Sequence, residues 1–262
     1  TSTGSPRGQF VTPYGQFSPL GFYAMAAMRH MHQYGTRPEQ LAAVAVAARK
    51  WAQMNPKAYR REPLTVEECL ASPFVAEPLR LRDCCLVTDG GGALVVTSTE
   101  RARDLASTPV SIRGFASGFS HHFTPLELED WLDIGVSGGT EDALAMAQVS
   151  RADLDFVQIY DHFTICVIKT LDDMVFCARV EGGDFVSGGR IAPGGGFPLN
   201  TSGGGLSYNH PGMFGMLLMI EAVRQLRGEC GPRQVKDARL GIVFGAAMVF
   251  SGYTVMVLER EK

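Results

Sequence analysis

The sequence has little that would mark a membrane-spanning, secreted or nucleic-acid-binding protein. Its most apolar stretch, 241–258, is interrupted by Gly241, Gly245 and Gly252, which favours two buried strands joined by a tight turn over a membrane helix. The net charge of the 262 residues is −3 and the arginines are scattered singly or in pairs, so no basic surface for nucleic acid is indicated. The N-terminus is polar and shows no signal-peptide pattern.

The sequence also lacks cysteine motifs that bind metal or build a disulfide framework. None of the six cysteines forms a Cys-x-x-Cys pair, and no His/Cys cluster has zinc-ligand spacing. We therefore expect no metal, no disulfides and a reducing, cytoplasmic compartment. The cysteines are interpreted as small core residues, the usual fate of free cysteine: Cys69, Cys84, Cys85, Cys166, Cys177 and Cys230.

Helical and strand patterns alternate along most of the chain, whose hydrophobic content of 45% is typical of globular proteins. Apolar residues at helical spacing, with start signals such as Pro38 and Thr65, predict helices. The predicted helices are 20–34, 37–53, 65–70, 98–105, 140–148, 164–176 and 213–227. The predicted strands are 109–116, 156–160, 239–246 and 253–259. This alternation indicates an α/β fold with a mixed sheet.

The first strand signals come only after residue 78. Residues 79–85 alternate apolar and charged side chains, residues 93–97 are a second strand-like run, and the three glycines 90–92 between them predict a hairpin. An α/β domain normally contributes strands from its start. We therefore expect that the sequence begins partway into a fold.

The glycine-rich stretch 200–212 is the strongest candidate for a site. Consecutive glycines allow backbone amides to approach a ligand closely, and Pro211 suits the first turn of the helix predicted next. This places His210 at a helix N-terminus, where a neutral imidazole is favoured and can donate a hydrogen bond or accept a proton. The alternative is a glycine-rich surface loop with a solvent-facing histidine.

The second candidate is the run Tyr160-Asp161-His162-Phe163-Thr164, where a buried strand meets a helix. In open α/β sheets, residues at the carboxyl ends of strands face the ligand, so Tyr160, Asp161 and His162 form a plausible acid/base set. The alternative is that Asp161 or Thr164 caps the helix while Tyr160 and His162 pack on the core. From these residues alone, the two interpretations are equally supported.

Together these motifs resemble the thiolase superfamily, and most closely its sterol-carrier-protein and lipid-transfer-type branch, over essentially the whole chain. Several independent motifs occur in the family's order, which makes the resemblance specific. They are residues 77–85, 88–93, 160–164, 199–204, 209–211 and 224–228.

The resemblance implies a five-layered αβαβα fold built of two similar halves and usually dimeric. Residues 1–108 would hold an irregular insertion and the last strands of an incomplete first half, and residues 109–262 would form the complete second half. The family's nucleophilic cysteine lies in the first half, upstream of residue 1, and about a hundred residues would be missing if the family's length applies. We therefore assign that nucleophilic role to no cysteine of this chain.

Two departures from the family pattern concern its acid/base cysteine. Conventional thiolases carry a Cys-x-Gly motif near the C-terminus, whereas the matching stretch 243–248 has no cysteine. The sterol-carrier branch instead has a cysteine third in its His-Asp-Cys-Phe motif, where this chain has His162. The customary cysteine is absent from both places.

The resemblance implies an enzyme acting on coenzyme A thioesters, and two reactions remain open. We rank acyl transfer first: His210 would activate an upstream nucleophile and bind the thioester oxygen, and His162 or Tyr160 would move the proton. The alternative is retro-aldol cleavage of a branched 3-hydroxyacyl-CoA, as in the steroid side-chain aldolases of the superfamily. Tyr160 and Tyr208 would then supply base and acid, and His210 or backbone amides would hold the enolate. A non-catalytic scaffold subunit is the third hypothesis.

Further expectations concern ligands and partners. Gly203, Gly204 and Asn209 are expected to contact the coenzyme A thioester, which is part of the substrate, and no separate cofactor is expected. The resemblance implies a homodimer, the missing first half and a small OB-fold partner protein. The helix 213–227 is expected to be buried, so that Met216→Asp would destabilise the protein through an unpaired buried charge.

Overall fold

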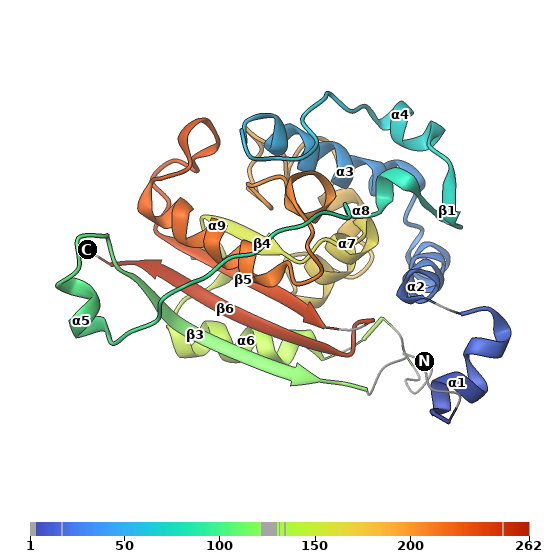
Figure 1. Cartoon of the computed structure of the whole chain (residues 1–262), viewed down its shortest axis with the longest axis horizontal. Coiled ribbons are helices and arrows are strands. Elements are labelled where there is room, and N and C mark those ends of the chain that lie inside the picture. Colours follow the sequence, from blue (N-terminus) through green and yellow to red (C-terminus); the bar gives the residue numbers. More distant parts are fainter. Residues whose placement is uncertain are drawn as a thin grey trace.

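The computed structural model describes residues 4–16, 18–121, 130, 132–133, 135–247 and 249–261 (Figure 1). The helices are α1 Pro6–Phe10, α2 Pro19–Tyr34, α3 Pro38–Gln53, α4 Val66–Ala71, α5 Thr99–Arg103, α6 Val136–Ala147, α7 Thr164–Asp173, α8 Gly182–Phe185 and α9 Gly215–Arg227. The strands are β1 Phe74–Ala76, β2 Leu79–Arg80, β3 Val110–Phe119, β4 Phe156–Ile159, β5 Leu240–Ala247 and β6 Gly252–Arg260. Single helical turns are η1 Thr12–Tyr14, η2 Leu81–Asp83, η4 Arg151–Asp153, η5 Gly204–Tyr208 and η6 Gly231–Arg233.

A four-stranded mixed sheet in the order β3-β6-β5-β4 forms the centre of the molecule. The pairs β3–β6 and β6–β5 are antiparallel, and β5–β4 is parallel. Alternate residues of each strand point to opposite faces. One face, with Val157 and Ile242, joins the core cluster that includes α6 and α7, and the other, with Phe156 and Val243, packs with α9.

The helices cover both faces of this sheet, as Figure 1 shows for α6 on one side and α9 on the other. Helices α2 and α3 pack against α7 and so form an additional layer on the α7 side. The predicted mixed α/β fold is therefore confirmed. No helix in the described part of the chain is long and apolar enough to cross a membrane.

Most predicted elements are present with ends shifted by a few residues. The largest shift is at α6, which begins at Val136 instead of residue 140 and includes Gly138 and Gly139. A Cβ at Gly139 would overlap the ring of Tyr253 on β6, so a glycine allows the helix to lie close to the sheet. The predicted loop 181–206 is interrupted by α8 and η5.

The predicted hairpin of 79–85 with 93–97 is wrong. Strand β2 is only Leu79–Arg80 and pairs with β1, while Cys84 bridges Phe163. Residues 86–98 form no strand and run along α9 to α5 (Figure 1). The β-branched residues that suggested a strand have no sheet neighbour among the described residues, and Val87 and Val95 are 98% and 93% exposed.

The predicted burial of Met216 is also wrong. Helix α9 buries the face formed by Leu217, Leu218, Ala222 and Leu226, which recur at helical spacing. Met216 lies beside that face and is 41% exposed. An aspartate at position 216 would therefore remain hydrated, and the expected loss of stability does not follow.

Asn200 holds the chain after α8 against strand β4. Its Oδ1 accepts from the backbone N–H of Ile159 at 2.7 Å, and its Nδ2 donates to the Ile159 carbonyl at 2.9 Å. The side chain thus satisfies both backbone groups of a buried strand residue. Asn200 itself is buried and has a φ of +50°, a conformation that asparagine tolerates better than most residues.

We predict that Asn200→Ala lowers the free energy of unfolding by about 2–4 kcal/mol, because it leaves a buried N–H and a buried C=O without partners. Gln148→Ala is the matched control, since Gln148 also has a positive φ (58°) but is exposed. Urea unfolding of both variants measures the difference. Equal losses in the two variants would show that only backbone strain is involved.

Candidate functional site

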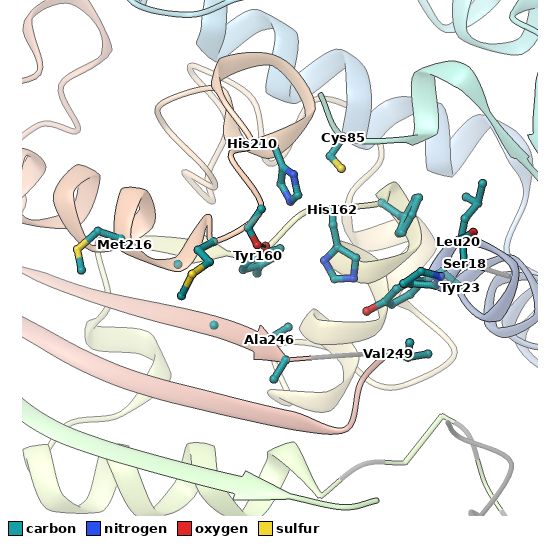
Figure 2. Close-up of a pocket in the computed structure, with 17 residues that line it drawn as sticks. Ser18, Leu20, Tyr23, Cys85, Tyr160, His162, His210, Met216, Ala246 and Val249 are labelled. Atoms are coloured by element: carbon teal, nitrogen blue, oxygen red, sulfur yellow. Dashed lines mark hydrogen bonds between the residues drawn. The ribbon is translucent and has the colours of Figure 1, made fainter. Parts of the chain in front are cut away.

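An apolar cavity of about 880 Å³ opens at the carboxyl ends of β4 and β5 (Figure 2). Its walls come from α2, the turn after β4, the start of α9 and the end of β5. The titratable side chains that line it are Tyr23, Cys85, Tyr160, His162 and His210. A largely apolar cavity with a few convergent polar groups is the usual form of a small-molecule site.

Tyr160 stands between the two histidines. Its ring centroid lies 5.1 Å from that of His162 and 5.6 Å from that of His210, both at steep angles. Its hydroxyl donates to the Gly212 carbonyl at 3.2 Å and accepts from the N–H of Phe214 at 3.4 Å. Burial raises the pKa of Tyr160 above its usual value, so the phenol is protonated at neutral pH.

Both histidines are neutral and each has a buried ring nitrogen without a hydrogen-bond partner in the described protein. These atoms are Nδ1 of His162 and Nε2 of His210. Burial lowers the pKa of His162 to about 3, with a further contribution from His210, and burial also lowers the pKa of His210. Because buried polar atoms are normally paired, a ligand that supplies the missing partners fits this site.

Asp161 joins the turn after β4 to the glycine-rich segment. Its fully buried carboxylate accepts from the N–H of Gly205 at 2.7 Å and from that of Leu206 at 3.4 Å. Burial raises its pKa to about 7, against the opposing effect of these amides. Asp161 does not line the cavity. Its contacts therefore place it in support of the site, and the predicted catalytic role remains a prediction.

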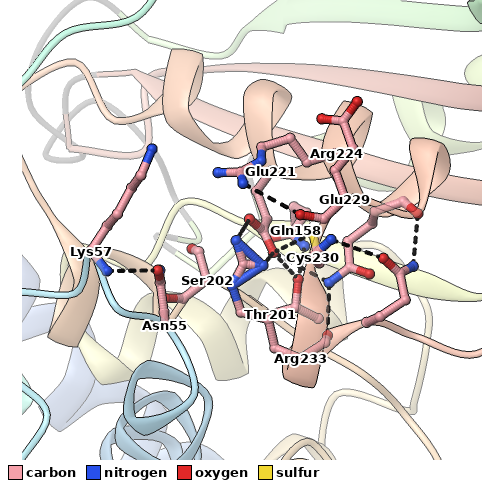
Figure 3. Close-up of polar contacts among 12 residues, drawn as sticks. Asn55, Lys57, Gln158, Thr201, Ser202, Glu221, Arg224, Glu229, Cys230 and Arg233 are labelled. Carbon is pink, nitrogen blue, oxygen red and sulfur yellow. Dashed lines mark hydrogen bonds and ion pairs between the residues drawn. The ribbon is translucent and has the colours of Figure 1, made fainter. Parts of the chain in front are cut away.

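The segment just before the glycines is held by a buried polar network (Figure 3). Thr201 accepts from Gln158 at 3.0 Å and donates to Glu221 on α9 at 2.6 Å, and Glu221 pairs with Arg233 at 3.1 Å. Asn55 donates to the Ser202 carbonyl at 2.8 Å. The glycine-rich turn thus starts from a point fixed by β4, by α9 and by the end of α3.

The two glycines predicted to contact the ligand, Gly203 and Gly204, lie against other parts of the protein and not against the cavity. Gly203 and Gly204 both have positive φ, and a Cβ would overlap Ala52 at the first and the Asp161 carboxylate at the second. Asn209 accepts from Thr88 at 3.0 Å and donates to the Asp89 carbonyl at 3.2 Å. None of the three lines the cavity, so this placement does not support their predicted contact with the thioester.

Two further expectations about the glycine-rich segment are not met. Helix α9 begins at Gly215, so Pro211 lies outside it and His210 is in the link before the helix and not at its first turn. Tyr208 ends the π-helical turn η5 and packs with the cluster around Phe214 on the α9 side of the sheet. It is not among the cavity-lining residues, unlike Tyr160.

Sequence reasoning missed two of the five titratable residues that line the cavity. Tyr23 on α2 lies 4.4 Å, between ring centroids, from His162 and is 4% exposed. On the apolar face of a predicted helix it could not be distinguished from a core residue. Cys85 was assigned to the core but lines the cavity, and its N–H donates to the His162 carbonyl at 2.9 Å. Only its place at the end of the family motif 77–85 could have marked it.

The arrangement suits proton transfer on a bound carbonyl compound. It brings together a protonated phenol and two neutral imidazoles, while burial raises the pKa of Cys85 to about 12 and keeps its thiol protonated. The described residues contain no group of three or more His, Cys, Asp or Glu side chains that could hold a metal ion.

Comparison with known proteins identifies the domain and its relatives. The family described as "Thiolase C-terminal domain-like" matches residues 117–260. A 17-hydroxy-3-oxo-4-pregnene-20-carboxyl-CoA lyase of Mycobacterium tuberculosis is 42% identical over 84% of this chain and 58% of its own. An acetyl-CoA acetyltransferase of Methanothermobacter thermautotrophicus is 37% identical over 84% of this chain and 58% of its own.

Among solved structures, one named "Ltp2-ChsH2(DUF35) aldolase" superimposes with a TM-score of 0.88 and 36% identity. The match covers 96% of this chain and 66% of that chain. The present chain therefore spans well under two thirds of the two curated relatives and about two thirds of the solved one.

We predict that Gly204→Ala destabilises the protein and displaces the turn η5, because its methyl group would meet the Asp161 carboxylate at a left-handed backbone position. Gly189→Ala is the control, since Gly189 also has a positive φ (+78°) but has open space around it. The control should lose about 1–2 kcal/mol in unfolding free energy, and Gly204→Ala more. Similar losses would contradict close contact with Asp161.

We predict that His162 makes stability fall in acid. The unfolded imidazole takes up a proton below pH 6.5, whereas the folded one stays neutral down to about pH 3, so the unfolded state binds more protons between these values. Asp161, with a pKa of about 7 instead of 3.8, has the opposite effect over pH 3.8 to 7. The two therefore oppose each other in the wild type.

His162→Gln isolates the histidine contribution. Relative to this variant, the wild type should lose up to about 1.4 kcal/mol per pH unit between pH 6.5 and 3, measured by chemical unfolding at each pH. A stability difference that stays constant over this range would contradict the low pKa of His162.

Proposed function

Because the chain belongs to the thiolase superfamily, we propose that it contributes one half of an active site that cleaves a branched 3-hydroxyacyl-CoA by a retro-aldol reaction. The observation that carries this proposal is the composition of the cavity. Tyr160, His162 and His210 supply proton donors and acceptors, and Cys85, the one cysteine among its described lining residues, has a protonated thiol. Thiolase-type acyl transfer uses a cysteine thiolate as nucleophile, whereas a retro-aldol step needs none.

His210 and Tyr160, whose rings lie next to each other, fit the roles of base and acid. His210 Nε2 is buried and has no hydrogen-bond partner among the described residues. In the tautomer that carries the proton on Nδ1, its lone pair would remove the proton from the substrate's β-hydroxyl. The electrons of the O–H bond form the new carbonyl, the Cα–Cβ bond breaks, and its electrons pass to the thioester as an enolate. Tyr160, protonated because it is buried, would return a proton to Cα. Loss of the acquired proton from His210 and uptake of a proton by the Tyr160 phenolate would restore both groups. The products are a ketone or aldehyde and a shortened acyl-CoA.

The cavity supports a bulky apolar acyl group. Its volume of about 880 Å³ lies in the range of pockets for drug-sized ligands, and Leu20, Phe163, Met213 and Met216 are among its lining side chains. The name of the Mycobacterium tuberculosis relative gives a steroid carboxyl-CoA as its substrate. We propose a substrate of the same size class here.

A smaller crevice beside the cavity supports binding of the coenzyme A part. It has a volume of about 270 Å³ and is lined by three arginines, Arg49, Arg60 and Arg82. Cys85 lines both the crevice and the main cavity, so the two adjoin. Guanidinium groups bind phosphates well, and we propose that they hold the phosphates of coenzyme A while the thioester reaches His210.

The second candidate function is thiolase-type acyl transfer, which the resemblance to an acetyl-CoA acetyltransferase favours. It would require a cysteine from outside this chain to reach His210. A scaffold subunit without catalysis is the third, and it predicts that His210→Ala leaves a partner's turnover unchanged.

Assembly is part of the proposal. We propose that the protein works in the cytoplasm as a homodimer, with residues 109–262 as the C-terminal thiolase half. We propose that the exposed segment 86–98 pairs with polypeptide corresponding to the part of the relatives that this chain does not match. The name of the solved aldolase includes a DUF35 component, and we propose a small partner of that kind here.

The test uses the assembled enzyme with a branched 3-hydroxyacyl-CoA, and with an acyl-CoA plus free coenzyme A. We predict release of a ketone or aldehyde and a shortened acyl-CoA without consumption of free coenzyme A. Tyr160→Phe and His210→Gln should each lower kcat about 10²–10⁴-fold, the usual size of acid–base catalysis. Tyr208→Phe is the control outside the cavity and should retain most activity.

Two results would contradict the proposal. Consumption of free coenzyme A with formation of a new thioester would establish acyl transfer instead. Full activity of both Tyr160→Phe and His210→Gln would remove the proposed acid and base.

A further inference from the structure

Cys166, on helix α7, contacts the imidazole of His162 behind the cavity wall. Its Sγ lies 3.3 Å from Nε2 of His162, four residues earlier in the chain. Cys166 is on the first turn of α7 and is 1% exposed, and His162 is 8% exposed and lines the cavity. The cysteine is too deeply buried to meet a substrate, so any effect that it has on the reaction must pass through the histidine.

The direction of this hydrogen bond decides where His162 carries its proton. A neutral imidazole has one N–H and one lone pair, and the partner of one nitrogen determines the state of the other. Thiol sulfur is a weak acceptor, whereas an unprotonated imidazole nitrogen is a strong one. The S–H···Nε2 arrangement is therefore preferred to Nε2–H···S.

The protonation states of both groups agree with this direction. Burial raises the pKa of the Cys166 thiol well above its usual value, so the sulfur keeps its hydrogen, and burial lowers the pKa of His162 to about 3. The carbonyl of Tyr160 lies close enough to His162 to oppose that lowering.

Packing fixes the plane of the imidazole. The ring meets Tyr23 edge-on with centroids 4.4 Å apart, and it meets Tyr160 and Phe163 at 5.1 and 5.3 Å at similarly steep angles. The His162 carbonyl is held by the N–H of Cys85. With the ring confined, the remaining freedom is the position of its proton.

We propose that Cys166 is a positioning residue whose thiol donates to Nε2 of His162 and so fixes the tautomer with the proton on Nδ1. Nδ1 is the buried atom of this ring that has no partner in the described protein. It would donate to an oxygen of the bound substrate, the thioester oxygen in the reaction proposed above, on which this last step rests. His210 would present a lone pair and His162 an N–H, so two neutral histidines would have opposite roles.

The tautomer is tested by ¹⁵N NMR of protein labelled at histidine, with His162 assigned from the signals lost in His162→Gln. We expect a pyrrole-type Nδ1 and a pyridine-type Nε2 for His162 in the wild type and in Cys166→Ser, whose hydroxyl still donates. Cys166→Val, of similar size but without a donor, should shift this pattern toward the other tautomer. Melting temperatures verify that each variant is folded.

Activity provides the second measurement. Cys166→Val should lower kcat roughly two- to tenfold, the effect of losing one neutral hydrogen bond, and Cys166→Ser should restore it to within about twofold. A wild type protonated at Nε2, or an unchanged tautomer in folded Cys166→Val, would overturn the proposal. Retro-aldol activity that survives in His162→Leu, whose side chain has no N–H to donate, would contradict the role of the N–H in catalysis, while the NMR result would still decide the tautomer.

Discussion

The site depends on the buried carboxyl group of Asp161, which has no ion-pair partner among the described residues. Asp161 connects the end of β4 to the glycine-rich segment, because its two side-chain oxygens accept hydrogen bonds from the N–H groups of Gly205 and Leu206. This brings the end of β4, with Tyr160 and His162, against the segment that leads to His210. A carboxylate at this depth is costly to bury, and the two amides offset part of that cost, as the opposing effects on its pKa indicate.

Further contacts hold the connection between β4 and the glycine-rich segment in place. Asn200 attaches the preceding segment to β4, and Thr201 attaches it to α9 through Glu221. Polar groups thus hold the backbone, while apolar and aromatic side chains form most of the cavity wall. Acid–base catalysis needs groups held within hydrogen-bond reach of a substrate, and supporting shells of this kind supply that placement.

Sequence alone predicted the elements of the sheet and three of the five titratable residues in the cavity. Tyr160 and His162 were found because strand ends gather ligand-facing residues, and His210 because of its glycine-rich context.

Tyr208 was misplaced, since the direction of a side chain leaving a π-helical turn is set by tertiary packing. Cys85 and Tyr23 were missed because their neighbours in space are far away in sequence. The incorrectly predicted hairpin had the correct residues for a strand, but the described part of the chain provides no strand beside it.

That segment, 86–98, also has a consequence for handling the protein. Exposed β-branched residues on an extended backbone are a template for pairing with any other chain that offers a free edge. At high concentration the polypeptide should be prone to self-association through residues 86–98. Charged or proline substitutions at Val95 or Val96 would reduce this association. The same β-branched residues that suit a strand thus make the segment a liability whenever it is uncovered.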